Sequence, residues 1–197
     1  YLPTEFDSLA LLSSPFIVHT IAYWGEKNNG KVSQGESSAM RRWALIANTK
    51  SYYSSSAESK LDADLLTLRS GLGADSLLER LETQLGRLDV TEAEMLGKSI
   101  NSGYFKAMFI AFREDGAQDW YSKLEISVKH RGKDDKLQFH HIYPKAFLKQ
   151  NYPDLRRNQV NDISNLAFIG GGTNRKIGAK PPAEYLKKII ESSDVEL

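Results

Sequence analysis

Two adjacent histidines, His140 and His141, stand in the stretch FHHIYPK at residues 139–145. They are half of the four histidines in this chain of 197 residues. Imidazole has an unperturbed pKa of about 6.5, which suits it to proton transfer near neutral pH, and it is also a common metal ligand. A single histidine is most simply structural, whereas an adjacent pair could divide these two tasks. The elements around the pair decide between the two interpretations.

The residues that precede the pair alternate between apolar and polar side chains and predict a β-strand over KLQFHHI. Successive side chains of a strand point to opposite faces, so we expect Leu137 and Phe139 to face a core and His140 to face the other way. Pro144 disrupts strand pairing and restricts the residue before it, so the strand should end near His141. Both imidazoles would then border one small site.

Two asparagines follow in an ordered series of elements. Asn165 stands at the start of the apolar run NLAFI, and Asn174 follows the glycine turn Gly170–Gly172, where Thr173 is a candidate helix N-cap. Either asparagine alone is most simply explained as a cap of a turn or helix. A β-hairpin with a helix packed on it would, however, bring His140 and Asn174 together. An imidazole and an amide oxygen could then hold a divalent cation, with water and phosphate oxygens completing its shell.

Positive charge is concentrated in the same part of the chain. Residues 129–188 contain 13 Lys and Arg residues against 5 Asp and Glu residues, a local formal charge of +8 in a chain whose net charge is +1. Clustered positive charge is the footprint of a phosphate-binding surface, although a charged run also occurs as a merely solvated face. The candidates for contacts with nucleic acid are Lys145, Arg175, Lys176 and Lys180.

Composition excludes several classes of protein. The chain has no cysteine, which excludes disulfides and thiolate metal sites. No apolar run approaches the roughly 20 residues of a membrane span and no signal peptide is visible, so we expect a cytoplasmic protein without a membrane partner. The chain starts at Tyr1, which suggests a fragment of a longer protein.

Hydrophobic spacing predicts two domains. Residues 1–116 carry apolar side chains at helical intervals and predict a helical bundle, with His19 in its core or at an interface. Residues 117–197 read as short strands, irregular loops and a final helix that begins with proline. The expected fold class is α+β, mainly α, with the domain boundary near residue 117.

Three stretches, HHIYPKAFL, NDISNLAFI and TNRKIGAKPPAEYL, resemble the core of HNH (ββα-metal) endonucleases. They resemble, more narrowly, the C-terminal nuclease domain of GmrSD-type modification-dependent restriction enzymes. The upstream stretch RRWALIANTKSYYSSSAESKLDADLLTL resembles the helical region that precedes that domain. The family also has an N-terminal nucleotide-hydrolysing, DNA-sensing domain, and the resemblance makes that domain of the same full-length protein an expected partner.

The resemblance implies a role for each matching residue. His140 stands at the position of a metal ligand, His141 at that of the general base, and Asn165 at that of the asparagine that orients the loop carrying the base. Asn174 stands at the second metal-ligand position. An oxygen ligand there favours Mg²⁺ or Mn²⁺ over Zn²⁺.

The function expected from the residues and the resemblance is a metal-dependent DNA endonuclease in bacterial anti-phage defence, which nicks or cleaves phosphodiester bonds. One alternative is a non-catalytic DNA-binding or assembly module that retains the HNH fold. Another is a nuclease that acts on RNA. The sequence leaves the oligomeric state open.

Overall fold

The computed structural model describes residues 6–192. Its contacts divide the chain into two compact units. The helical unit consists of the described residues up to Glu94 together with Asn101–Met108, and the C-terminal unit consists of Met95–Ile100 together with the described residues from Phe109 onward. Helix α6 (Gly103–Glu114) contributes to both units, whereas the sequence predicts a domain boundary near residue 117.

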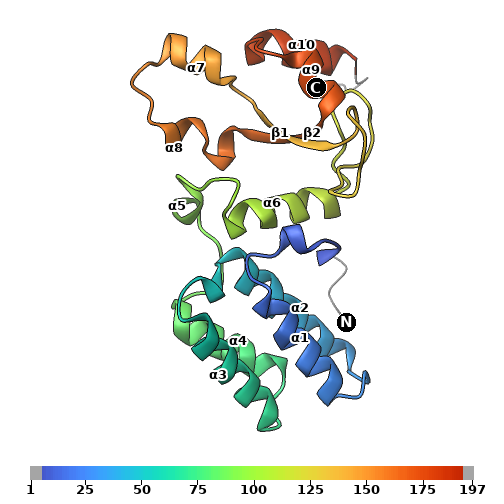
Figure 1. The fold of residues 1–197 in the computed structure, drawn as a ribbon, viewed down its shortest axis with the longest axis vertical. Coiled ribbons are helices and arrows are strands. Elements are labelled where there is room, and N and C mark those ends of the chain that lie inside the picture. Colours follow the sequence, from blue (N-terminus) through green and yellow to red (C-terminus); the bar gives the residue numbers. More distant parts are fainter. Residues whose placement is uncertain (1–5, 193–197) are drawn as a thin grey trace. The chain divides into compact units, whose positions relative to one another are not determined.

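Four helices build most of the helical unit (Figure 1). They are α1 (Phe16–Lys27), α2 (Gln34–Thr49), α3 (Ala57–Arg69) and α4 (Ala74–Leu85), and the short α5 (Glu92–Met95) follows them. Helix α2 packs against α4 and α1 packs against α3. Their apolar stripes meet in a core that contains the fully buried Trp43 and Leu81. His19 is exposed on α1, so it does not lie in the core, and its predicted alternative place at an interface stays a prediction.

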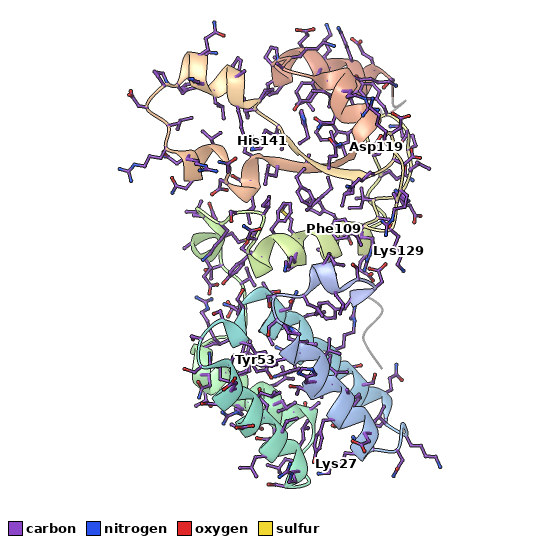
Figure 2. All side chains as sticks on the ribbon, viewed as in Figure 1. Lys27, Tyr53, Phe109, Asp119, Lys129 and His141 are labelled. Atoms are coloured by element: carbon purple, nitrogen blue, oxygen red, sulfur yellow. The ribbon has the colours of Figure 1, made fainter. Side chains whose placement is uncertain are left out.

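A buried carboxylate ties helices of this unit together. Asp64 of α3 accepts hydrogen bonds from the hydroxyl of Tyr53 at 2.7 Å and from Nε of Arg80, in α4, at 2.9 Å. Burial raises the pKa of Asp64, and the bonds from Tyr53 and Arg80 offset only part of this effect. Figure 2 labels Tyr53 within this network. Breaking such a pair would leave a charge or hydroxyl buried without a partner, so the network fixes how α3 and α4 pack.

The C-terminal unit is built on a two-stranded antiparallel sheet of β1 (Leu137–His141) and β2 (Leu166–Gly170). Two strands alone are marginally stable in water, so other elements must cover them. Helices α9 (Gly171–Ile177) and α10 (Pro182–Glu191) supply Ile177, Tyr185 and Ile189, which pack with Ala167 and Ile169 of β2. The chain is therefore α+β and mainly helical, as predicted, and α10 begins with proline as expected.

The opposite face of the sheet carries aromatic side chains. Phe168 of β2 is buried, and its ring lies 5.1 Å from that of Phe109 and 5.9 Å from that of Phe112, both in the second half of α6. Phe139 of β1 joins this group through an edge contact with Phe168 but is 42% exposed, whereas His140 on the other face is 4% exposed. The sequence predicts that Phe139 faces the core and His140 faces away, but His140 is the more deeply buried of the two side chains. The reason is that α9 and α10 cover the His140 face fully, while α6 covers the other face in part.

The connection between β1 and β2 is long and holds two short helices, α7 (Lys145–Asn151) and α8 (Arg157–Val160), followed by a 3-10 turn, Ile163–Asn165. After β2 the chain enters α9 at once, with Gly170 as the N-cap. The predicted N-cap, Thr173, instead lies inside α9. No helix within residues 6–192 combines the length and the hydropathy that crossing a membrane requires.

Candidate metal and general-base site

Antiparallel pairing brings the two histidines to the end of β1, as predicted. His140 lies opposite Ala167 and His141 lies opposite Leu166. Because side chains alternate along the strand, the two imidazoles point to different sides of the sheet edge and meet different neighbours. Each histidine therefore has its own set of partners.

His140 faces Asn174 of α9, the residue that the sequence pairs with it. Its Nδ1 lies 2.7 Å from Oδ1 of Asn174, and Nδ2 of Asn174 donates a hydrogen bond of 2.6 Å to Oε1 of Gln138. The Gln138 contact orients the amide so that its oxygen faces the imidazole. Since an amide oxygen only accepts, Nδ1 of His140 carries the proton that it donates to Asn174.

The remainder of the His140 ring is enclosed by aromatic side chains. The rings of Trp120 and Tyr185 stand edge-on to it, with centroids 6.2 Å and 5.7 Å away. Its Nε2 is buried and has no hydrogen-bond partner among the described residues. Burial lowers the pKa of His140, and the bond with Asn174 offsets this lowering only in part. The ring is therefore neutral near neutral pH, which is the state that a metal ligand requires.

The atoms that could donate to a cation at this position are Nδ1 of His140 and Oδ1 of Asn174. The two atoms already face each other, and movement of the imidazole proton from Nδ1 to Nε2 would leave their lone pairs adjacent. Within residues 6–192 no cluster of three or more His, Cys, Asp or Glu residues is arranged to hold a metal. A cation held by His140 and Asn174 would therefore complete its shell with water and phosphate oxygens, which is the way Mg²⁺ is commonly bound.

His141 is half-buried, and its ring is oriented by Asn161. Its Nε2 lies 3.1 Å from Oδ1 of Asn161, while Nδ2 of Asn161 donates a 2.7 Å hydrogen bond to the carbonyl of Arg157. This second bond fixes the amide, so Oδ1 faces the histidine and accepts its Nε2 proton. The lone pair of the neutral imidazole is then on Nδ1. The bond with Asn161 thus selects the nitrogen that can take a proton.

The surroundings of His141 also lower its pKa. Burial is the largest cause, the hydrogen bond with Asn161 opposes it, and the positive charge of Lys145 lowers the pKa further. A lowered pKa keeps His141 neutral, and so able to accept a proton, down to a lower pH than a free histidine.

Asn165 shapes the turn that follows the two histidines. Its Oδ1 accepts a 2.8 Å bond from the amide of Tyr143, and its Nδ2 donates to the carbonyl of Tyr143 at 3.2 Å and to that of Val160 at 3.0 Å. The chain leaving β1 is thereby tied to the chain entering β2. These bonds hold the backbone beside His141.

The four cations proposed to bind nucleic acid have different surroundings. Arg175 forms an ion pair with Asp134 and donates to the carbonyl of Lys133 at 3.1 Å. Lys176 lies over the ring of Tyr121, 4.9 Å from its centroid, and Lys180 donates to the carbonyl of Lys176 at 3.0 Å. These three side chains are exposed but engaged within the protein. Lys145, at the start of α7, is exposed, and the structure shows no ion pair for it among residues 6–192.

Three supporting residues, Gln138, Asn161 and Asp119, were missed from the sequence. Strand alternation could have found Gln138, because it lies two residues before His140 on the same face. Asn161 and Asp119 act through contacts that depend on the path of the surrounding loops. No pattern in the sequence predicts that path. Figure 2 labels Asp119 and His141, which lie at opposite ends of the hairpin.

Asp119 anchors the turn from β2 into α9. The side chain is 4% exposed; it accepts hydrogen bonds of 2.6 Å from the amide of Gly170 and from Oγ1 of Thr173, and one of 2.8 Å from the amide of Ser122. Burial by itself would raise the pKa of Asp119, but the bonds from Thr173, Ser122 and Gly170 outweigh it, so the pKa is lowered. The carboxylate thereby fixes the first turn of α9, which carries Asn174.

We expect Asp119→Asn to destabilise the C-terminal unit by about 2 kcal/mol, because an amide replaces a buried, charged acceptor of several hydrogen bonds. Urea unfolding followed by the fluorescence of the neighbouring Trp120 measures this loss. The exposed Asp115→Asn is the matched control and should be neutral.

The same pair of variants has a defined pH dependence. Because the folded pKa of Asp119 is lowered, its stabilisation is complete above the unfolded pKa of about 3.9 and is lost as the pH falls through the folded pKa. The difference between wild type and Asp119→Asn should therefore shrink in acid. A difference that is unchanged at low pH would contradict the assignment.

Comparison with known proteins identifies one relative of this chain by sequence. The chain is 25% identical over 158 residues to an uncharacterized protein of Methanocaldococcus jannaschii, MJ0686. The alignment covers 77% of this chain but 25% of that protein, so the chain spans about a quarter of the relative's length. No family model matches the chain, and no solved structure matches it. The geometry of the site therefore carries the functional argument.

Proposed function

We propose that this chain is a metal-dependent DNA endonuclease. The observation that carries the proposal is that the two adjacent histidines have separate partners suited to separate tasks. His140 shares a proton with the oxygen of Asn174, while His141 keeps its proton on Nε2 through Asn161 and holds a lone pair on Nδ1. His140 thus faces the amide oxygen with which it would hold a cation once its proton has moved to Nε2, and His141 has a free lone pair that can take a proton.

Phosphodiester hydrolysis uses both tasks. Nδ1 of His141 accepts a proton from water as the water oxygen attacks phosphorus, and the bond from phosphorus to the 3′ oxygen breaks. The products are a 5′ phosphate and a 3′ hydroxyl. A bound divalent cation, Mg²⁺ or Mn²⁺ rather than Zn²⁺, would stabilise the negative charge that develops on the phosphate oxygens and on the leaving oxygen. His140 and Asn174 would hold it, and Asn165 keeps the turn beside His141 in place.

The resemblance to HNH nucleases of the GmrSD type extends this proposal to biology. In that setting the chain is the cutting part of a modification-dependent restriction system directed against phage DNA in the bacterial cytoplasm. Its regulation would come from a nucleotide-hydrolysing domain elsewhere in the same protein. The ββα-metal core of such enzymes corresponds in this proposal to β1, β2 and α9.

The alternative is a non-catalytic DNA-binding or assembly module that keeps the fold, and one observation favours it. His140 is 4% exposed and its proton is shared with Asn174, so a cation must displace an existing hydrogen bond in a nearly closed site. The two functions differ in whether cleavage occurs and depends on metal.

We expect His141→Ala to abolish cleavage while DNA binding is largely kept, because the base is lost but the cationic surface is not. His140→Ala should abolish cleavage and also weaken Mn²⁺ binding. Conversion of supercoiled plasmid in Mg²⁺ or Mn²⁺, with EDTA as the reference, measures the first effect, and calorimetric Mn²⁺ titration the second. His19→Ala, on the exposed face of α1, is the control. Intact plasmid at high concentration of wild-type protein would favour the alternative, and full activity of His141→Ala would refute the base assignment.

The pH dependence of cleavage should report the lowered pKa of His141. Activity requires the neutral ring, so the rate should fall in acid with a midpoint below about 6.5. Lys145→Gln removes a charge that lowers this pKa and should move the midpoint to higher pH. Lys149→Gln, on the same helix, should leave it in place. A midpoint that does not respond to Lys145→Gln would exclude His141 as the titrating group.

Asn161 is a positioning residue in this scheme. We expect Asn161→Ala to lower kcat about twofold or more, because an even division of neutral His141 between two tautomers halves the competent population and the ring also loses its fixed orientation. DNA affinity should not change. The ¹⁵N chemical shifts of the His141 ring, measured without metal or DNA, report the tautomer directly. Asn158→Ala, exposed on α8, is the control. An unchanged Nε2-protonated ring in Asn161→Ala would show that Asn161 does not select the tautomer.

A further inference from the structure

The connection between β1 and β2 leaves the candidate site and returns to it. It begins directly after His141 and ends at Asn161 and Asn165, which bond to His141 and to the turn beside it. Between these points the chain passes through α7 and α8, which Figure 1 shows on the long segment that joins the two strands. Every residue from Lys149 to Gln159 is exposed. This length of connection is far more than a hairpin needs, and it buries little.

The exposed connection carries positive charge without partners. Between Tyr143 and Asn161 its cations are Lys145, Lys149, Arg156 and Arg157, against the single acid Asp154. The structure shows no ion pair for any of these four side chains within residues 6–192.

Three exposed cations elsewhere in the C-terminal unit have carboxylate partners. Arg175 pairs with Asp134, Lys188 lies 3.6 Å from Glu184 and Lys187 lies 4.0 Å from Glu191. The pairing on α10 shows that lysines at this protein's surface can be neutralised by the chain itself. The four cations of the connection lack such neutralisation among the described residues, and they lie together on a segment that is exposed throughout from Lys149 to Gln159.

Two exposed aromatic side chains stand among these cations. Tyr143 is 48% exposed and Tyr152 is 56% exposed. An amphipathic ring among cations is a common component of surfaces that bind nucleic acid, since the ring can contact sugar or base while the cations contact phosphate. The connection thus offers both types of contact next to His141.

We propose that residues 143–157, here called the basic arm, form the surface that binds the phosphate backbone of the DNA and presents a phosphodiester to His141. The location of the arm rests on the proposed function, because the arm is tied at both ends to the residues of the candidate site. Its charge is an independent argument. In this proposal the main contacts with DNA come from Lys149, Arg156 and Arg157. The cations expected from the sequence, Arg175, Lys176 and Lys180, are engaged within the protein.

A merely solvated basic surface would differ from this arm in the salt dependence of binding. Each phosphate contact that releases a counterion adds about 0.9 to the slope of log affinity against log salt for duplex DNA. Three contacts therefore contribute about 2.7 to the slope, which corresponds to roughly 40-fold in affinity between 50 and 200 mM salt. A solvated surface that does not touch the DNA contributes much less.

The test combines Lys149→Gln, Arg156→Gln and Arg157→Gln in one protein, in the His141→Ala background and in EDTA, so that no cleavage can occur. Lys145 is left unchanged because it also affects the pKa of His141. Binding to a fluorescein-labelled 20-base-pair DNA duplex is followed by anisotropy between 50 and 200 mM salt. We expect the slope to fall by about 2.7 relative to the His141→Ala parent.

The control is Lys187→Gln with Lys188→Gln in the same background, which removes two exposed charges of the same unit that have carboxylate partners. Its slope should stay close to that of the parent. Arg157→Gln alone should lower the slope by about 0.9, which gives a second measurement should the triple variant unfold. An unchanged slope in the triple and single variants, or an equal loss in the α10 control, would overturn the proposal.

Binding and cleavage separate this inference from the proposed function. If wild-type protein leaves plasmid intact while the arm variants lose their salt slope, the arm binds DNA and the nuclease assignment fails. If wild-type protein cleaves plasmid while the arm variants bind DNA with the parental slope, the nuclease assignment stands and the basic arm fails.

Discussion

The pairing of β1 with β2 is the constraint on which the C-terminal unit depends. Five residues on each strand pair, and this register sets His140 beside Ala167 and sends the chain into α9 immediately after Gly170. A two-stranded sheet is weak by itself. It is held here by burial on both faces, with Tyr185 of α10 on one and Phe109 of α6 on the other. The position of Asn174 relative to His140 follows from this arrangement.

The adjacency of the two histidines gains its meaning from the sheet. Neighbouring residues on a strand meet different environments, so two consecutive positions can hold imidazoles that carry their protons on different ring nitrogens. His140 is nearly enclosed by aromatic rings, and His141 remains half-buried at the strand end. Burial lowers both pKa values. Both rings are thus kept neutral, and hydrogen bonds to two different asparagines decide which nitrogen of each holds the proton.

The sequence alone predicts much of this arrangement because its signals are local. Alternation before His140, the strand-ending effect of Pro144 and the proline at the start of α10 each act over a few residues, and each prediction is confirmed by the structure. Asn161 and Asp119 could not be predicted, since their partners are set by loops whose path has no local pattern. The greater burial of His140 compared with Phe139 also escaped prediction, because it depends on which helices cover each face.

The glycines at the start of α9 have a consequence for how such a site can change. A side chain at Gly171 would collide with the carbonyl of Lys133, and one at Gly170 would stand 2.8 Å from the carbonyl of Asp134. The loop before β1 therefore packs directly against the first turn of the helix that carries Asn174. A change in the length of this loop would alter the spacing between Asn174 and His140 with both residues retained. The distance between these two side chains is in this sense adjustable from outside the pair.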